Sequence, residues 1–271
     1  MEGGEHATAL SHSAAGEAPA ARASTFVGTA GWSLPRAEQP RFPGDGTHLE
    51  RYARVLRGAE INASFYRPLR PELYAKWAAA VPADFRFAVK VPKSVTHEQR
   101  LLDCEVPLAS FLDEVAALGE KLGPLLVQLP PSLEYDASLA GAFFAVLRAL
   151  HDGPVAVEPR HATWFTTDAA TLLDEYAIAR AAADPARVPD AAVPGGWHGL
   201  AYFRLHGSPR IYWSRYDAAW ISALATQATA AARTAREVWC IFDNTASSSA
   251  LPNALELLER LPTSSGAERE R

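Results

Sequence analysis

The chain has 271 residues, of which 48% are hydrophobic and 21% are charged, and its formal net charge is −5. This length and apolar content suffice for one large buried core, so we expect a single folded domain. The negative charge excludes a general attraction to nucleic acid but leaves room for a local basic patch. No segment has the run of about 18 apolar residues that is typical of a membrane helix, so we expect no membrane partner.

The two ends of the chain differ from the rest. Residues 1–24 are rich in Ala, Gly, Ser and His and lack an apolar stretch of signal-peptide length, and residues 263–271 are polar. We expect two disordered tails around one domain at residues 25–262. Cys104 and Cys240 are too few for a disulfide framework and lack the paired spacing of a zinc site, which favours a cytoplasmic location.

Eight short apolar runs follow one another along the chain, and helix signals separate most of them. The expected strands are residues 26–31, 58–65, 86–92, 124–130, 155–161, 178–185, 201–207 and 237–244. The expected helices are residues 49–56, 72–80, 108–122, 137–150, 167–176, 218–236 and 253–261, with a capping-box pair at Thr47 and Glu50 and a cap at Asp136. This alternation predicts an α/β fold, a TIM-barrel-like (β/α)8 barrel. Residues 186–199, between the sixth and seventh strands, contain two prolines and three glycines, so we expect an irregular connection there.

Polar side chains occupy the downstream ends of seven of these runs. In the third run, Phe87, Val89 and Val91 alternate with Lys90, so Lys90 faces the side of the sheet opposite the apolar residues. Because the carboxyl ends of barrel strands meet at one mouth, where barrel active sites are built, the polar residues are expected there together. The set is Glu60, Asn62, Ser64, Lys90, Gln128, Glu158, Arg160, Asp184, Arg204, His206 and Asp243.

The charges in this set allow a structural interpretation as well as a functional one. Four carboxylates (Glu60, Glu158, Asp184, Asp243) stand against three fixed cations (Lys90, Arg160, Arg204). Such near balance is typical of an ion-pair lattice that plugs a barrel. Burying these charges costs several kcal/mol per ion unless the pairing is excellent, and apolar filling would be simpler. The cost, together with the position at the mouth, favours a functional pocket.

Four of these residues are candidates for catalysis. His206 is the best acid–base candidate, because a histidine at a strand end titrates near neutrality and is readily oriented by a carboxylate. Glu158 or Asp243 would complete the acid–base pair. Lys90 could form a Schiff base if apolar neighbours lowered its pKa, but nearby carboxylates would oppose that shift.

Other polar residues near the strand ends are candidates for substrate binding. They are Asn62, Ser64, Tyr66, Arg67, His97, Gln128, Arg160, Asp184 and Arg204. Residues 207–210, after the seventh strand, correspond to the region where barrels often bind phosphate. An aromatic rim of Trp32, Tyr66, Trp164 and Trp213 would surround the site.

A metal centre is disfavoured. Glu158, Asp184, His206 and Asp243 could supply oxygen ligands and one imidazole. Cations in the same mouth would repel a divalent ion, and no His-x-His or Glu-x-x-His pair is present. We therefore predict no metal and no cofactor.

Six ordered strings carry a family resemblance. They are GTAGWS at 28–33, EINASFYR at 60–67, FAVKVPKSVTHEQRL at 87–101, LLVQLPPS at 125–132, VEPRHATWF at 157–165 and YFRLHG at 202–207. Together they resemble the DUF72 family, often called YecE-like, which implies a TIM-barrel-like fold of uncharacterised activity. The chain departs from the commoner family pattern at Leu34-Pro35-Arg36 and at the turn around Asp243 and Asn244.

The sequence leaves three functions open. The favoured one is an enzyme that acts on a small anionic substrate, phosphorylated or carboxylated, by hydrolysis, isomerisation or lyase chemistry. The second is a nucleic-acid-binding or repair-associated protein whose basic residues and aromatic rings hold a backbone and a splayed base. The third is a non-catalytic binding scaffold. The sequence does not specify an oligomeric state.

Overall fold

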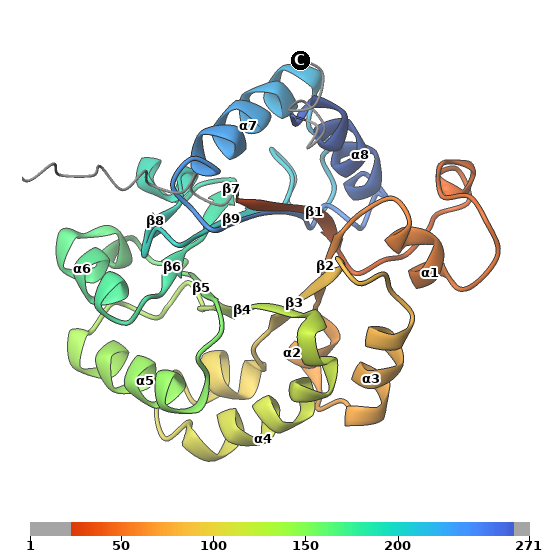
Figure 1. Ribbon diagram of the computed structural model, residues 1–271. Helices are drawn as coiled ribbons and strands as arrows, with labels where there is room; N and C mark the ends of the chain where they lie inside the picture. Colours follow the sequence, from red (N-terminus) through yellow and green to blue (C-terminus); the bar gives the residue numbers. More distant parts are fainter. Residues whose placement is uncertain (1–22, 263–271) are drawn as a thin grey trace, which may run out of the picture.

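A computed structural model describes residues 23–262, and within them the strands form a central ring with the helices packed around its outside (Figure 1). The strands are β1 (Ser24–Ala30), β2 (Gly58–Ile61), β3 (Arg86–Lys90), β4 (Leu122–Gln128), β5 (Val155–Glu158), β6 (Ala179–Arg180), β7 (Ala182–Asp184), β8 (Gly195–Gly196), β9 (Leu200–Leu205) and β10 (Glu237–Phe242). The helices are α1 (His48–Ala53), α2 (Ala63–Tyr66), α3 (Pro71–Ala79), α4 (Glu105–Val115), α5 (Ala137–Leu150), α6 (Thr167–Glu175), α7 (Ala218–Ala231) and α8 (Ala250–Arg260). The expected tails lie outside the described residues, except for Ala23 and Ser24, and Ser24 begins β1.

The ring has the eight strand positions that the sequence predicts. The strand order is β7-β9-β10-β1-β2-β3-β4-β5-β6-β8, and all pairs are parallel except β6 with β8. The short strands β6 and β7 are two halves of the sixth position, since β6 pairs with β5 and β7 with β9. Ala181, between the halves, donates its N–H to Val157 at 2.8 Å. The barrel is therefore closed through one interrupted strand, and the TIM-barrel-like fold is confirmed.

The connection after the sixth strand is irregular, as the sequence predicts. It contains the short 3-10 helix η5 (Pro189–Ala192) and the two-residue strand β8 in place of an α-helix. Elsewhere the helix signals hold: Thr47 and Glu50 form a capping box at α1, and Asp136 caps α5 at 2.8 Å. The expected helix at 108–122 differs, because α4 ends at Val115 and a 3-10 segment, η3 (Ala116–Lys121), follows it with Gly119 at φ 54°.

Two apolar cores lie on opposite faces of the strands. The outer core, between strands and helices, contains Phe87, Val89, Val157, Phe203 and Phe242 among many others. The inner core fills the lower half of the barrel with Phe26, Tyr202 and Trp239. Phe26 stacks on Trp239 at 4.5 Å between ring centroids, and Tyr202 stacks on the same indole at 6.2 Å.

Small residues make room for these rings. Ala88, Ala156, Ala179 and Ala181 face the lumen with them, and at Gly123 an added Cβ would lie 2.7 Å from the Trp239 ring. Contacts this close are typical of a packed protein interior. The aromatic layer therefore forms a floor beneath the polar strand ends.

Both cysteines, Cys104 and Cys240, are buried and free. Among the helices of residues 23–262, none combines the length and the apolar character that crossing a bilayer requires.

Candidate functional site

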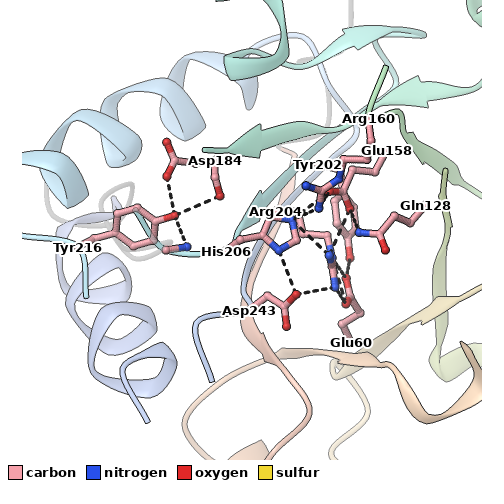
Figure 2. Close-up of polar contacts among 11 residues, drawn as sticks. Glu60, Gln128, Glu158, Arg160, Asp184, Tyr202, Arg204, His206, Tyr216 and Asp243 are labelled. Carbon is pink, nitrogen blue, oxygen red and sulfur yellow. Dashed lines mark hydrogen bonds and ion pairs between the residues drawn. The ribbon is translucent and has the colours of Figure 1, made fainter. Parts of the chain in front are cut away.

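The polar side chains at the strand ends converge on one another, with Arg204 among them (Figure 2). We call the converging residues the mouth cluster: Glu60, Lys90, Gln128, Glu158, Arg160, Arg204, His206 and Asp243. Their lumen position follows from the alternation of each strand, because Ala88, Ala156 and Tyr202 lie two residues earlier in the inner core while their neighbours lie in the outer core. The structure thus brings these predicted residues together.

Arg204 is the centre of the cluster. Its Nε donates to Glu60 Oε2 at 3.0 Å and its Nη2 to Glu60 Oε1 at 2.7 Å, which makes a two-pronged ion pair. Its Nη1 reaches Glu158 Oε2 at 3.2 Å, and Nη2 also lies 3.0 Å from Asp243 Oδ2. Only 1% of Arg204 is exposed. All three nitrogens are thus engaged with carboxylates of the cluster.

Two further donors complete the carboxylate shells. The Tyr202 hydroxyl, from the aromatic floor, donates to Glu60 Oε2 at 2.8 Å, and the Gln128 amide donates to Glu158 Oε2 at 3.0 Å. Tyr202 was not among the predicted site residues. It lies two residues before Arg204 on the same strand face, so the alternation that placed Arg204 could have found it.

His206 lies between two carboxylates. Its Nδ1 is 3.1 Å from Asp243 Oδ2 and its Nε2 is 2.9 Å from Glu158 Oε1, while Arg160 Nη2 lies 2.7 Å from the same Nε2. Nε2 needs a lone pair to accept from Arg160 and a proton to donate to Glu158, so both contacts cannot be hydrogen bonds at once. An Nε2 without a proton would accept from Arg160, and an Nε2 that carries one would donate to Glu158.

The charges of the cluster lower the pKa of two acidic residues, Glu158 and Asp243. Burial raises the pKa of Glu158, but Arg160, Arg204 and His206 outweigh it and keep that pKa well below the usual value. At Asp243 burial is likewise outweighed by Arg204 and His206, which leaves the pKa lowered. Glu158 and His206 have no exposed surface, whereas the side chain of Asp243 is 10% exposed. Asp243 is therefore the acidic group of this network that meets the mouth.

Lys90 differs from the other cations of the mouth. It is 6% exposed, and its ammonium lies 3.9 Å from the centroid of the Phe65 ring. Within residues 23–262 no carboxylate comes within 4.0 Å of it, and no acceptor takes its N–H groups. Burial, assisted by Arg204 and opposed by the three carboxylates, lowers the pKa of Lys90 to about 8. The carboxylates oppose the shift, as expected, but burial outweighs them.

Four predicted binding residues follow β2, but not as a continued strand. β2 ends at Ile61, and α2 follows, so the expected strand over 58–65 is wrong from residue 62 onward. Ser64 is buried, and its hydroxyl donates to the Lys90 carbonyl at 2.7 Å, a structural contact. Asn62 Oδ1 is buried without a partner among the described residues, whereas Tyr66 and Arg67 are exposed.

His97 lies in the π-helical turn η2 (Ser94–Glu98) after β3. Its ring packs edge-on against Phe65 at 5.0 Å and pairs with the Thr96 hydroxyl at 2.8 Å. Burial, with the charges of Lys90 and Arg160, lowers its pKa. His97 is thus a neighbour of the mouth cluster and not a member of it.

Asp184 points away from the mouth cluster. Figure 2 shows it on the far side of His206, where it accepts a hydrogen bond from the Tyr216 hydroxyl at 2.7 Å. Its place in the predicted set is wrong: Ile178 and Ala182, on the same face of the sixth strand, lie in the outer core. Without Asp184, three carboxylates (Glu60, Glu158 and Asp243) meet three fixed cations (Lys90, Arg160 and Arg204) in the cluster.

Only some groups of the expected phosphate-binding loop and aromatic rim are free to contact a ligand. The Gly207 N–H donates to the Tyr216 hydroxyl at 2.8 Å, and the Arg210 guanidinium stacks on Trp213 at 4.3 Å. Trp164 is buried and donates to the Leu133 carbonyl, so it is not a rim residue. Tyr212, absent from the prediction, lies edge-on to the His206 ring at 5.7 Å.

No group of three or more His, Cys, Asp or Glu side chains in the described part of the chain is arranged to hold a metal ion. In the mouth cluster each carboxylate faces a guanidinium. Those contacts occupy the oxygens that a cation would need.

Two related proteins match part of this chain. The UPF0759 protein YecE of Escherichia coli K12 is 33% identical over 98 residues, which are 36% of this chain and 36% of YecE. The UPF0759 protein YunF of Bacillus subtilis is 25% identical over 150 residues, 52% of each chain. These alignments span between about a third and a half of the relatives' length.

Solved structures match over more of the chain. The crystal structure of a DUF72 family protein from Enterococcus faecalis V583 has a TM-score of 0.74 at 25% identity and covers 89% of this chain and 96% of that one. A DUF72 family protein from Thermotoga maritima MSB8 has a TM-score of 0.72 at 24% identity, with 87% and 98% covered, which supports the fold alone. The family model described as "Protein of unknown function DUF72" matches residues 26–270. The resemblance seen in the sequence is thereby confirmed, and the chain belongs to the DUF72 family.

Proposed function

We propose that this protein is an enzyme that binds a small anionic molecule, phosphorylated or carboxylated, at the barrel mouth and transforms it by proton transfer. One observation carries the proposal: two mouth cations, Lys90 and Arg160, keep N–H donors that no acceptor of the described chain takes. Arg160 is 10% exposed, and its Nη2 contacts Glu158 and His206, while its buried Nε has no partner. The Nε of Arg160 is a buried donor without an acceptor among the described residues, which is rare in folded proteins and calls for a ligand or water.

A phosphate or carboxylate group supplies what these donors lack. Its oxygens would accept charge-assisted hydrogen bonds from Arg160 and Lys90, bonds roughly twice as strong as those between neutral groups. Arg204 contributes its charge but no free donor. The proposal therefore assigns the anion to Arg160 and Lys90.

The proton-transfer part rests on Asp243 and His206. Asp243 is a carboxylate at neutral pH and meets the mouth, so it acts first as a base. His206, buried behind it at 3.1 Å, positions Asp243. The reaction stays open among hydrolysis, isomerisation and lyase chemistry.

A thermal-shift screen tests the anion site. The purified protein is heated with inorganic phosphate, sulfate and a panel of phosphorylated and carboxylated metabolites, since a ligand bound only by the native state raises the melting temperature. We expect the shift in the parent chain and in Arg210→Met, and its loss in Arg160→Met. Loss in Arg210→Met alone would place the anion at the loop after β9, and no shift for any compound would remove the proposal.

The hits are then tested for turnover by NMR of the mixture. Asp243→Asn is expected to bind the hit and to lose conversion. His206→Asn is expected to move the pH profile of turnover, a change that a mere packing role would not produce. Binding without conversion in the parent chain would favour the scaffold function instead.

A second candidate function has one supporting observation. Tyr66, Tyr212 and Trp213 expose large aromatic surfaces near the mouth, and Arg67 and Arg210 lie beside them in the sequence. Rings and guanidinium groups of this kind can hold a single-stranded nucleic acid. Binding of short oligonucleotides that weakens steeply with salt would support this function; salt-independent or absent binding would exclude it.

A further inference from the structure

Lys90 has an environment that the anion site alone does not require. Its side chain is almost entirely buried, and the face of the Phe65 ring, 3.9 Å away, covers its ammonium group. Arg160 and Arg204, two fixed positive charges, belong to the same cluster. In the described residues no side chain or carbonyl accepts a hydrogen bond from the Lys90 ammonium.

The surroundings of Lys90 favour its neutral amine form more than water does. Burial disfavours the charged form of Lys90 and the charge of Arg204 disfavours it further, against the opposing charges of Glu60, Glu158 and Asp243. With a pKa of about 8, roughly a tenth of Lys90 is a neutral amine at pH 7, compared with less than about a thousandth of an ordinary lysine. The neutral amine is the nucleophilic form.

We propose that Lys90 is a nucleophile that forms a Schiff base with an anionic aldehyde or ketone held at Arg160. This inference rests on the proposed function and narrows its substrate class to carbonyl compounds that carry a carboxylate or a phosphate. The anion binds Arg160, and the carbonyl carbon meets the Lys90 amine under the Phe65 ring.

The bond changes balance with groups at the mouth. The lone pair of the Lys90 amine adds to the carbonyl carbon, and one amine proton moves to the carbonyl oxygen to give a carbinolamine. A second proton, delivered by the Asp243 and His206 pair, allows the hydroxyl group to leave as water, and a protonated imine remains. One amine, one carbonyl and one proton thus yield one iminium ion and one water molecule, with no oxidant or reductant.

The chain suits a chemical test because it has four lysines, Lys76, Lys90, Lys93 and Lys121. Lys93 is the matched control: it lies three residues from Lys90, is exposed and pairs with Glu98 at 2.8 Å. Borohydride reduces an imine to a stable secondary amine that trypsin does not cleave. A labelled Lys90 would therefore join residues 87–90 to residues 91–93 in one peptide.

The experiment incubates the full chain with glyoxylate, pyruvate or dihydroxyacetone phosphate, adds sodium borohydride, and maps the adduct by mass spectrometry. Glycolate, lactate and glycerol phosphate are the controls without a carbonyl group. We expect Lys90 to be labelled at least about ten times faster than Lys93 at pH 7, with a rate that rises to a midpoint near pH 8. We expect the adduct to be missing in Lys90→Arg and kept in Lys93→Arg.

Equal labelling of Lys90 and Lys93, or none at Lys90, would overturn the inference. The peptide map of the parent chain decides this even if a variant fails to fold. If the labelling result overturns the inference, the thermal-shift data still test the proposed function. A shift by the same anions that is lost in Arg160→Met would leave that function in place, with Lys90 as an ordinary cation. If the anions produced no shift either, both proposals would fall together.

Discussion

Arg204→Met is the sharpest test of what holds the mouth cluster together. Arg204 is almost completely buried and contacts the carboxylates of Glu60, Glu158 and Asp243. Methionine keeps most of the volume but removes the charge. Removing one partner of a buried ion pair lowers stability by roughly 3–5 kcal/mol, because the remaining charge stays buried and uncompensated. For a domain of this size a change of 1 kcal/mol moves the melting temperature by about 2–4 °C, so we expect a loss of roughly 6–20 °C.

The measurement is urea and thermal unfolding beside a matched surface variant. Arg41→Met removes an arginine that is 44% exposed and pairs with Glu259 at 3.2 Å. Exposed ion pairs contribute about 0–1 kcal/mol, so this variant is expected to unfold close to the parent midpoint. Equal losses of stability in the two variants would mean that the buried ion pairs of Arg204 stabilise the fold no more than the exposed pair of Arg41 does.

The pH dependence of the Arg204→Met loss gives a second criterion. In the parent chain the lowered pKa values of Glu158 and Asp243 contribute stability above their unfolded values, near 4, and this contribution is lost as the pH falls. Without Arg204 these carboxylates are buried charges that gain from protonation. The stability gap between the two chains should therefore narrow as the pH falls from 8 toward 5. A variant as stable as the parent at every pH would refute the central role of Arg204.

Three further substitutions probe the floor and the free cation. Lys90→Met should be more stable than the parent at pH 7, because the lowered pKa of Lys90 destabilises the folded parent below about pH 8. Urea unfolding should show the difference in the free energy of unfolding between the two chains shrink by up to roughly 3 kcal/mol as the pH rises from 8 to 10.5. A gap that does not depend on pH would contradict this reasoning. Tyr202→Phe deletes a buried hydrogen bond to Glu60 and should cost roughly 1.5–3 kcal/mol in the same assay; a neutral effect would show that Glu60 does not need it. Gly58→Ala places a methyl group 3.3 Å from Trp239, so it should lower the free energy of unfolding by about 1–3 kcal/mol and change the tryptophan emission spectrum. Unchanged stability would mean that the aromatic floor repacks around the added methyl group.

Alternation along the strands was enough to predict most of the mouth cluster. Lys90, Glu158, Arg204 and His206 face the lumen because their sequence neighbours are large apolar residues that pack under helices. A period of two fixes the face of every side chain in a strand, whatever the rest of the fold does. The order of strands and helices, and with it the barrel, followed from the same local patterns.

The strand ends were less predictable. The pattern over Glu60, Asn62 and Ser64 continues beyond β2, but β2 pairs with its neighbours only as far as Ile61. A strand exists where a partner offers hydrogen bonds, and that partner lies far away in the sequence. Asp184 is a different case, since the alternation of its own strand places it on the outer face with Ala182.

The sequence by itself determined which side chains enter the lumen, because that depends on local periodicity. Only the tertiary structure decided how they share their bonds. Arg204 meets Glu60 across 144 positions of the chain, and it pairs with three carboxylates that no local pattern brings together. The same distribution leaves Lys90 without a carboxylate. Charge balance among residues can be counted in a sequence, but satisfaction of each donor depends on distances of a few ångströms that long-range packing sets.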